Sequence, residues 1–381
     1  MLQTDGGAAM TDREKAYMHW LYQAVGMGNR GTLKRLKQIG TPEEIYGLAK
    51  QGRLAERLSD RYRNKAEQIT ACAAGYDVAA EYEKLIGAGI SFVTGGEPSY
   101  PRRLAMIPDA PCALYYVGKL PDDEKPAIAI IGARNCSEYG RGMAKQFGEA
   151  LASAGVQIVS GMARGIDGIG QGAALQADGY SLGVLGCGVD ICYPPDNKEL
   201  YEELIASGGI CSEYPPGTTP RAVLFPPRNR IISGLCDGVL VIEAKERSGT
   251  LITVDMALEQ GREVYALPGR ATDLLSLGCN RLIRQGAALV TSPQELLRDL
   301  GVSGSEKEDY RQQTLFLPEG VQGRLFELLD YQPKSMEQLQ QEYANLYGSR
   351  LSVPELCREL LGLCADGYAG RIGGNYYVKK M

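Results

Sequence analysis

The sequence predicts an α/β fold: a Rossmann-like, doubly wound and mostly parallel sheet, with a helical domain before it and a winged-helix domain after it. Between residues 90 and 297, short runs that are apolar throughout alternate with amphipathic helical segments. Such runs are typical of strands buried on both faces, and the helices between them supply the crossovers that parallel strands need. The 48 glycines are concentrated in this region, as expected for tight strand-to-helix turns.

The 381 residues are enough for two or three domains. We predict an N-terminal helical domain over residues 12–75, a Rossmann-like domain over 80–300 and a winged-helix domain over 315–381, with a polar linker at 303–314. The predicted strands of the central sheet are residues 127–133, 156–163, 181–188, 208–214, 237–244, 262–269 and 287–291.

In the N-terminal domain, apolar residues recur three and four apart, which is the helical period. The turn VGMGNRG at residues 25–31 resembles a helix-hairpin-helix, as in SAM-like domains. Its backbone N–H groups can hold a DNA phosphate, and a plain helical turn is the alternative. Residues 1–10 are expected to be unstructured.

The C-terminal domain is predicted to hold three short helices followed by a hairpin around Gly373 and Gly374. Ser335 and Ser352 have the spacing of capping boxes. The third helix, at about 353–366, carries more acidic than basic residues, so we expect it to contact protein rather than DNA.

Composition limits the possible functions. The net charge is −5 and the pI about 5.3, so any anion site must be local. His19 is the single histidine, and the ten cysteines form no Cys-x-x-Cys pair, so we expect neither a metal nor a cofactor. Without a signal peptide or an apolar run near the roughly 18 residues of a membrane span, we expect a cytoplasmic protein with reduced thiols and no membrane association.

The loops that follow the strands are the places where a doubly wound sheet binds ligands. The first loop, Gly132-Ala133-Arg134, has one glycine and then an arginine, so it lacks the Gly-x-Gly-x-x-Gly pattern of nicotinamide and flavin sites. A glycine, an arginine and a helix N-terminus still predict a phosphate site. The alternative for Arg134 is an ordinary surface ion pair.

Two further loops share this chemistry. The second loop offers Ser160, Gly161, Arg164 and Gly165 to an anion, while Asp167 either belongs to that site or caps the next helix. Ser248-Gly249-Thr250 precedes another helix, and phosphate binding and ordinary capping are both consistent with it.

The run LFPPRNRIISGL, residues 224–235, is the third candidate. It contains Phe225, Arg228, Asn229 and Arg230, and no acidic residue lies between Glu213 and Asp237. Because its prolines restrict φ, we interpret it as the stiff rim of a local cationic groove. Phosphates spaced along one groove describe a single strand of nucleic acid, for which Phe225, Tyr214 and Tyr193 are candidate stacking platforms. The loops contain no recognisable catalytic set; Glu213 and Glu243, at strand ends, are solitary carboxylates.

Taken together, these motifs resemble the DNA-processing protein A (DprA, or Smf) family over about residues 90–290. They are Ile131-Gly132-Ala133-Arg134, Ser160-Gly161-Met162-Ala163, Gly165-Ile166-Asp167, Tyr193-Pro194, Ser212-Glu213, Phe225-Pro226-x-Arg228-Asn229-Arg230, Ser248-Gly249-Thr250 and Pro268-Gly269.

The resemblance implies a homodimeric protein that protects single-stranded DNA in natural transformation and loads the RecA recombinase onto it. Carried over by position, the DNA contacts are Arg134, Lys198, Phe225, Arg228 and Arg230. A further candidate, Arg221, is indicated by charge alone.

One departure from the family pattern concerns catalysis. Gly170-Gln171 stands where the family commonly has Ala-His, which favours a non-enzymatic protein; a neutral substitution behind the site is the alternative for this pair. The alternative is an enzyme of the Rossmann-like nucleotide phosphoribohydrolase type, whose phosphate loop looks like Ser248-Gly249-Thr250. That family places a glutamate three residues after its Gly-Thr, where this chain has Thr253; the nearest glutamate downstream is Glu259.

Overall fold

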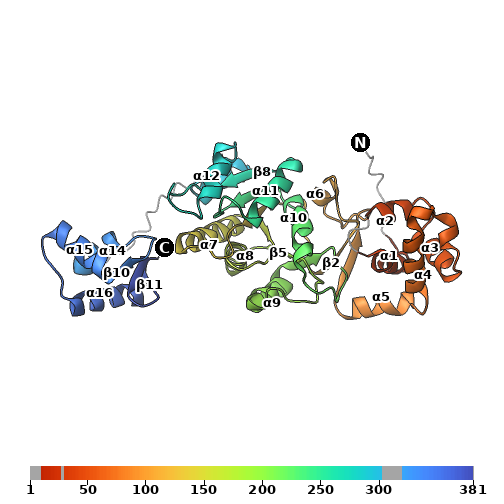
Figure 1. Cartoon of the computed structure of the whole chain (residues 1–381), viewed down its shortest axis with the longest axis horizontal. Helices are drawn as coiled ribbons and strands as arrows, with labels where there is room; N and C mark the ends of the chain where they lie inside the picture. Colours follow the sequence, from red (N-terminus) through yellow and green to blue (C-terminus); the bar gives the residue numbers. More distant parts are fainter. Residues whose placement is uncertain (1–9, 27–29, 303–319, 381) are drawn as a thin grey trace.

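The structure is a computed structural model that describes residues 10–26, 30–302 and 320–380 (Figure 1). Four segments discussed above lie partly or wholly outside the described residues: the first nine residues, positions 27–29 of the glycine-containing turn, the predicted linker at 303–314, and residues 315–319 and 381 of the predicted winged-helix domain.

The N-terminal part of the chain consists of helices. Two of its helices begin with a capping box, formed by Thr11 with Glu14 and by Thr41 with Glu44. The helices are α1 (Asp12–Val25), α2 (Arg30–Leu36), α3 (Pro42–Lys50), η1 (Leu54–Arg57), η2 (Asp60–Tyr62), α4 (Arg63–Ala73) and α5 (Val78–Gly87).

A nine-stranded sheet forms the centre of the molecule, in the order β1-β2-β6-β5-β4-β3-β7-β8-β9. The seven strands from β6 to β9 in this order are parallel, which confirms the predicted mostly parallel sheet. The antiparallel edge of the sheet, where β1 pairs with β2 and β2 with β6, was not predicted from the sequence. The strands are β1 (Ser91–Thr94), β2 (Ala113–Gly118), β3 (Ala127–Ile131), β4 (Gln157–Ser160), β5 (Ser181–Val184), β6 (Gly209–Ser212), β7 (Gly238–Val241), β8 (Glu263–Ala266) and β9 (Ala288–Leu289).

Helices cover both faces of this sheet. Strand β3 shows why: Ile128 and Ile130 pack in the core beneath α7 (Glu138–Ser153), α8 (Ile166–Gln176) and α13 (Pro293–Asp299). Its alternate residues pack in the opposite core, beneath α10 (Phe225–Gly234), α11 (Gly249–Glu259) and α12 (Leu277–Arg284). The remaining helices here are α6 (Arg102–Ala105), η3 (Pro195–Asn197), α9 (Lys198–Ser207) and η4 (Ala222–Leu224).

The neighbouring strands β3 and β7 form the topological switch point of the sheet. The helix after β3, α7, lies on one face and the helix after β7, α11, on the other, so the two chain segments diverge at the carboxyl edge. A doubly wound sheet leaves a crevice at such a point.

The C-terminal part comprises α14 (Gly320–Leu328), β10 (Lys334–Ser335), α15 (Met336–Tyr347), α16 (Val353–Ala365), β11 (Ala369–Ile372) and β12 (Tyr376–Lys379). These elements enclose their own apolar core. Among the described residues, this part contacts the region of the sheet through the loop after β8 and through α7: Nη2 of Arg270 donates to both carboxylate oxygens of Asp330, at 2.9 and 2.8 Å, and the rings of Tyr139 and Tyr331 lie 6.0 Å apart. In Figure 1 this part and the N-terminal helices lie at opposite ends of the molecule.

Within the described residues, no helix is both long enough and apolar enough to cross a membrane.

Candidate nucleic-acid interface

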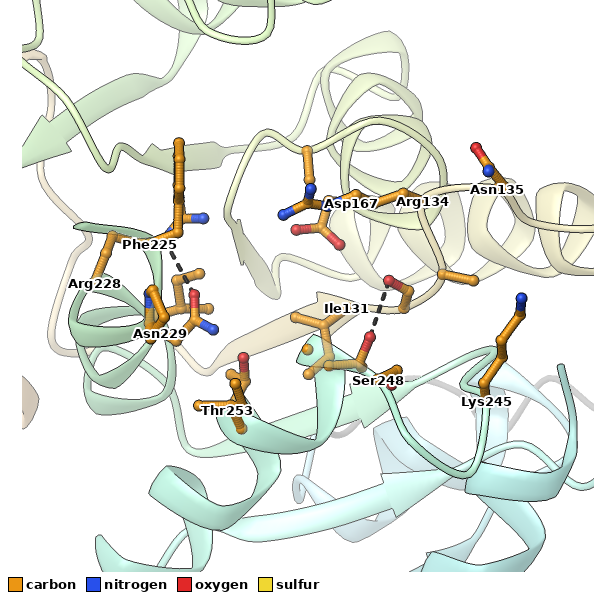
Figure 2. Close-up of a pocket in the computed structure, with 18 of the residues that line it drawn as sticks. Ile131, Arg134, Asn135, Asp167, Phe225, Arg228, Asn229, Lys245, Ser248 and Thr253 are labelled. Carbon is orange, nitrogen blue, oxygen red and sulfur yellow. Dashed lines mark hydrogen bonds between the residues drawn. The ribbon is translucent and has the colours of Figure 1, made fainter. Parts of the chain in front are cut away.

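A cavity of about 650 Å³ opens at the switch point (Figure 2). The loop after β3, the loop after β7 and the first turns of α10 form its walls. Eight of the fifteen predicted site residues line it: Gly132, Arg134, Phe225, Arg228, Asn229, Ser248, Gly249 and Thr250. The other seven are not among its lining residues: Ser160, Gly161, Arg164, Gly165, Lys198, Arg221 and Arg230.

Two exposed cations line the cavity from opposite loops. Arg134 follows β3 and Lys245 follows β7. Neither forms an ion pair with any residue that the structure describes, so the surface-pair alternative for Arg134 finds no partner in that part of the chain. Lys245 was missed because a lone lysine after a strand has no motif to mark it.

The run LFPPRNRIISGL is helical rather than a loop, and the first turn of this helix, α10, lines the cavity. Pro226 and Pro227 occupy the first turn of α10, where a missing N–H costs nothing. Residues two apart on a helix lie about 200° apart, so Arg228 and Arg230 point in different directions.

Arg228 forms a wall of the cavity. Its guanidinium donates to the carbonyl oxygens of Gly161, at 3.0 Å, and Val184, and its Nε donates to Oδ1 of Asn229 at 3.2 Å. The side chain is only 6% exposed, and burial lowers the pKa of its guanidinium without discharging it. Arg228 therefore contributes a fixed, oriented positive charge rather than a mobile contact.

Arg230 does not belong to a free cationic cluster. Its Nη2 lies 2.7 Å from Glu213 and its Nε 2.8 Å from Asp109, and the residue is 5% exposed. The sequence window between Glu213 and Asp237 contained no acid, but the fold supplies both carboxylates from outside that window. The prediction that this arginine is unneutralised was wrong.

The polar groups of the second loop, residues 160–165, are engaged in contacts within the protein. The Ser160 hydroxyl donates to the Ile130 carbonyl at 2.6 Å, and the Gly161 N–H donates to Asp167 at 3.2 Å. Gly165, with φ 75°, has no room for a Cβ against the carbonyl groups of the first loop. Arg164 pairs with Asp196. The Gly161 N–H of the predicted anion site is thus occupied by Asp167, which also lines the cavity; the start of α8 has no side-chain cap, so the capping alternative for this residue was wrong.

Gln171, at the family's histidine position, is fully buried and lies outside the cavity lining. It accepts from the Met162 N–H at 3.0 Å and donates to the Leu182 carbonyl at 2.9 Å. These bonds tie α8 to the second loop and β5, so the amide serves packing of the loop.

The two hydroxyls of the loop Ser248-Gly249-Thr250 have different roles. Thr250 donates to the Gly132 carbonyl at 3.1 Å, which joins the two loops at the switch point. Ser248 makes no capping bond, and its buried Oγ has no hydrogen-bond partner among the described residues. A buried hydroxyl without a partner in a cavity wall is available to a ligand.

An aromatic pair lies at the cavity. The rings of Tyr193 and Phe225 are stacked at 5.4 Å, and the guanidinium of Arg228 lies 5.8 Å from the Phe225 ring. Tyr193 is 40% exposed and offers a ring face to a ligand. Tyr214 is only 4% exposed, with its hydroxyl on the Leu224 carbonyl, so its predicted stacking role was wrong.

The remaining candidates lie outside the cavity. The Nζ of Lys198 lies 3.7 Å from Oε1 of Glu202. Arg221 is exposed and is the chain neighbour of the lining residues Pro220 and Ala222. Their contacts with DNA stay predictions.

The two strand-end glutamates are engaged elsewhere. Glu213 pairs with Arg230, while Glu243 accepts from the Ser137 N–H at 2.9 Å at the start of α7. Neither is among the lining residues, and burial raises the pKa of Glu243. No group of three or more potential metal ligands occurs among the described residues.

Fold and site together define a Rossmann-like α/β protein with a cationic, partly aromatic cavity at its switch point. The family model for DNA recombination-mediator protein A matches residues 91–301, which include all of the cavity lining. The chain belongs to that family, and the resemblance read from the motifs is confirmed.

Individual relatives agree with this assignment. Protein Smf of Escherichia coli is 48% identical over 202 residues, and DNA processing protein DprA of Streptococcus pneumoniae is 46% identical over 200. These matches cover 53% and 52% of this chain, and 54% and 71% of the relatives, so the chain matches only about half the length of the first. The solved structure of the S. pneumoniae protein has a TM-score of 0.63 at 35% identity, covering 77% of this chain and 99% of that one.

Proposed function

We propose that this chain binds single-stranded DNA at the switch-point cavity and acts as a recombination mediator. The observation that carries the proposal is the lining of one cavity by Arg134, Lys245 and Arg228 beside the Tyr193–Phe225 ring pair. Cations follow a phosphate backbone, and ring faces stack on any unpaired base. The chain is acidic overall, so this local site, not bulk charge, provides the attraction.

Substitution of Arg134 tests the proposal. Arg134→Ala should weaken binding of unstructured oligonucleotides similarly for every sequence and reduce the salt slope by about 0.7 per lost phosphate contact. The measurement is a fluorescence anisotropy titration over a range of salt, with single- and double-stranded probes side by side.

The matched control is Arg298→Ala, which removes an exposed arginine from α13, away from the cavity lining. Its salt slope should equal that of the wild type. If Arg134→Ala and Arg134→Ala/Lys245→Ala both keep the wild-type slope, the cavity is not the DNA site.

The wider activity is part of the same proposal. Names of the relatives and the family support DNA processing, and we infer that the protein protects single-stranded DNA in natural transformation, loads RecA onto it and works as a homodimer in the cytoplasm. We also propose that residues 315–381 form a winged-helix domain, supported by the order of helices and strands between α14 and β12. Its α16, with Glu355 and Glu359, faces protein rather than DNA.

We propose a non-catalytic mediator rather than a nucleotide-cleaving enzyme. Thr253 lines the cavity where the phosphoribohydrolase pattern requires glutamate, and Glu259 is not a lining residue. Asp167 is the single carboxylate among the lining residues in the described part of the chain. Release of base or phosphate from nucleotides by the purified protein would contradict this proposal.

A further inference from the structure

The N-terminal helices carry a cluster of basic residues in a chain that is acidic overall. Residues 50–65, the basic segment, contain six lysine and arginine residues and two acidic ones, whereas the net charge of the whole chain is −5. The segment runs from the end of α3 through η1 and η2 into α4. Figure 1 shows α3 and α4 at the outer end of the N-terminal helices, away from the sheet. A local excess of one sign creates an attractive field for anions.

Both acidic residues of the basic segment are already paired with arginines of the same segment. Oε2 of Glu56 lies 3.4 Å from Nε of Arg53, and Oδ1 of Asp60 lies 2.6 Å from Nη2 of Arg63. Four cations of the segment form no ion pair with any residue that the structure describes: Lys50, Arg57, Arg61 and Lys65. The excess positive charge therefore has no counter-charge within the described part of the chain.

The way the segment packs explains why these cations face solvent. Leu54 in η1, and Ala66 and Ile69 in α4, are fully buried in the core that the N-terminal helices share with β1 and β2. The apolar side chains thus point inwards, while Lys50, Arg57 and Arg61 are exposed. The packed elements hold the cations at the surface, so this is a structured basic surface.

Aromatic rings lie among the cations. Nζ of Lys50 lies 5.4 Å from the centroid of the Tyr46 ring, and Cζ of Arg61 lies 5.9 Å from that of Tyr62. Both tyrosines are partly exposed. The switch-point cavity has the same combination of cations and ring faces. A nucleic-acid strand uses both, because its phosphates pair with cations and its bases stack on rings, whereas an acidic protein surface needs the charge alone.

We propose that the basic segment is a second binding surface for single-stranded DNA, which holds a part of the strand that flanks the part bound in the switch-point cavity. The inference rests on the proposed function, because it assigns a further contact surface to the same strand. Contacts with phosphates and ring faces make binding independent of base sequence. The segment lies on α3 to α4 and the cavity beside α10 and α11, so only a long strand engages both (Figure 1).

The test compares two oligothymidylates, a short probe of about 6 nucleotides, the size of one small binding site, and a long probe of about 40. Anisotropy titrations over a range of salt give the affinity and salt slope of each. For Lys50→Gln/Arg57→Gln/Arg61→Gln, the long-probe slope should fall by about 2, which is three contacts at about 0.7 each. Arg57→Gln alone should lower it by about 0.7. The short probe should bind both variants as it binds the wild type.

Lys125→Gln/Lys145→Gln/Arg298→Gln is the matched control. It removes the same number of exposed cations and changes the net charge equally, but from three separate places outside the basic segment and the cavity lining. Its long-probe slope should equal that of the wild type. None of the substituted side chains forms an ion pair with a described residue, so both triple variants should unfold in urea as the wild type does.

Each failure has its own signature. A wild-type long-probe slope in the folded triple variant overturns the inference. Equal losses for the short and the long probe, or a loss confined to double-stranded probes, overturn it as well. A short probe that does not bind the wild type, or that binds Arg134→Ala/Lys245→Ala unchanged, overturns the proposed cavity site instead.

Discussion

At the residue scale, two arginines separated by one residue have different environments. Arg228 is held against the carbonyl oxygens of Gly161 and Val184 in the cavity wall, whereas Arg230 is neutralised by Glu213 and Asp109. Sequence spacing alone cannot separate them, because their partners lie up to 121 positions away and only the fold brings them near.

Arg230→Ala should therefore reduce stability and leave DNA binding intact. Removing one partner of a buried ion pair typically costs about 3–5 kcal/mol, and the exposure of Asp109 places this pair near the lower end. Urea unfolding measures the loss, and the oligonucleotide titration should give a wild-type salt slope for the protein that remains folded. A stable variant with a reduced slope would assign Arg230 to the DNA site. Arg221→Ala, at an exposed position, is the stability control.

At the element scale, the strands of the parallel sheet could be predicted because each is an apolar run too short for a buried helix. The α10 segment could not be identified as a helix in this way, because two consecutive prolines favour a loop until their place in the first turn is known. The antiparallel β1 and β2 were missed because their packing partners come from the N-terminal helices: Phe92 and Tyr115 share a core with Trp20 and Leu21.

The residues of the site could be predicted from the sequence only in part. Glycine and arginine after β3 marked one wall of the cavity correctly, because the carboxyl ends of parallel strands meet at one edge. No sequence motif marks Lys245 as a residue of the cavity. The sequence also does not show that the Gly161 N–H donates a hydrogen bond to Asp167. Those outcomes depend on distances between loops, which the order of residues does not contain.

Helices α7 and α8 approach one another through glycine, and this contact gives an element-scale prediction. A Cβ built on Gly148 would overlap the carbonyl oxygen of Gly170, which is backbone and cannot move aside cheaply. Gly148→Ala should lower the free energy of unfolding by about 1–3 kcal/mol. Gly172→Ala, on α8 with nothing within 4 Å, should instead raise it by up to about 1 kcal/mol. Equal effects of the two substitutions in denaturant melts would show that the helices are not in close contact.

At the scale of the whole molecule, the two ends of the chain join the sheet differently. The N-terminal helices share one continuous core with β1, β2, β6 and the loop after β5, so they extend the central unit rather than form a body apart. The C-terminal part has a separate core and meets the sheet through the Arg270–Asp330 pair and the Tyr139–Tyr331 contact. A change at the N-terminal junction should therefore alter the stability of the sheet as well as that of the N-terminal helices.

Protonation of His19 is such a change. This residue belongs to α1, faces β2 and is 2% exposed; Gln23 donates to its Nε2 and its Nδ1–H donates to the Tyr115 hydroxyl, each at 2.9 Å. Burial lowers the pKa of His19 to about 4, from 6.5 for an ordinary histidine. The unfolded chain therefore binds a proton that the folded chain refuses between pH 6.5 and 4. Stability from this residue is complete above pH 6.5 and falls as the pH drops towards 4.

The expected loss is about 2 kcal/mol between pH 7 and pH 5, since one unit of pKa difference corresponds to about 1.4 kcal/mol. Urea unfolding of the wild type and of His19→Gln at both pH values isolates the contribution, because the carboxylates common to both proteins cancel in the comparison. The variant, which has no group to protonate at this position, should lose about 2 kcal/mol less than the wild type over the interval. Parallel pH dependences would mean that the pKa of His19 is the same in the folded and the unfolded protein, and hence that His19 is solvated at this junction rather than buried in the shared core.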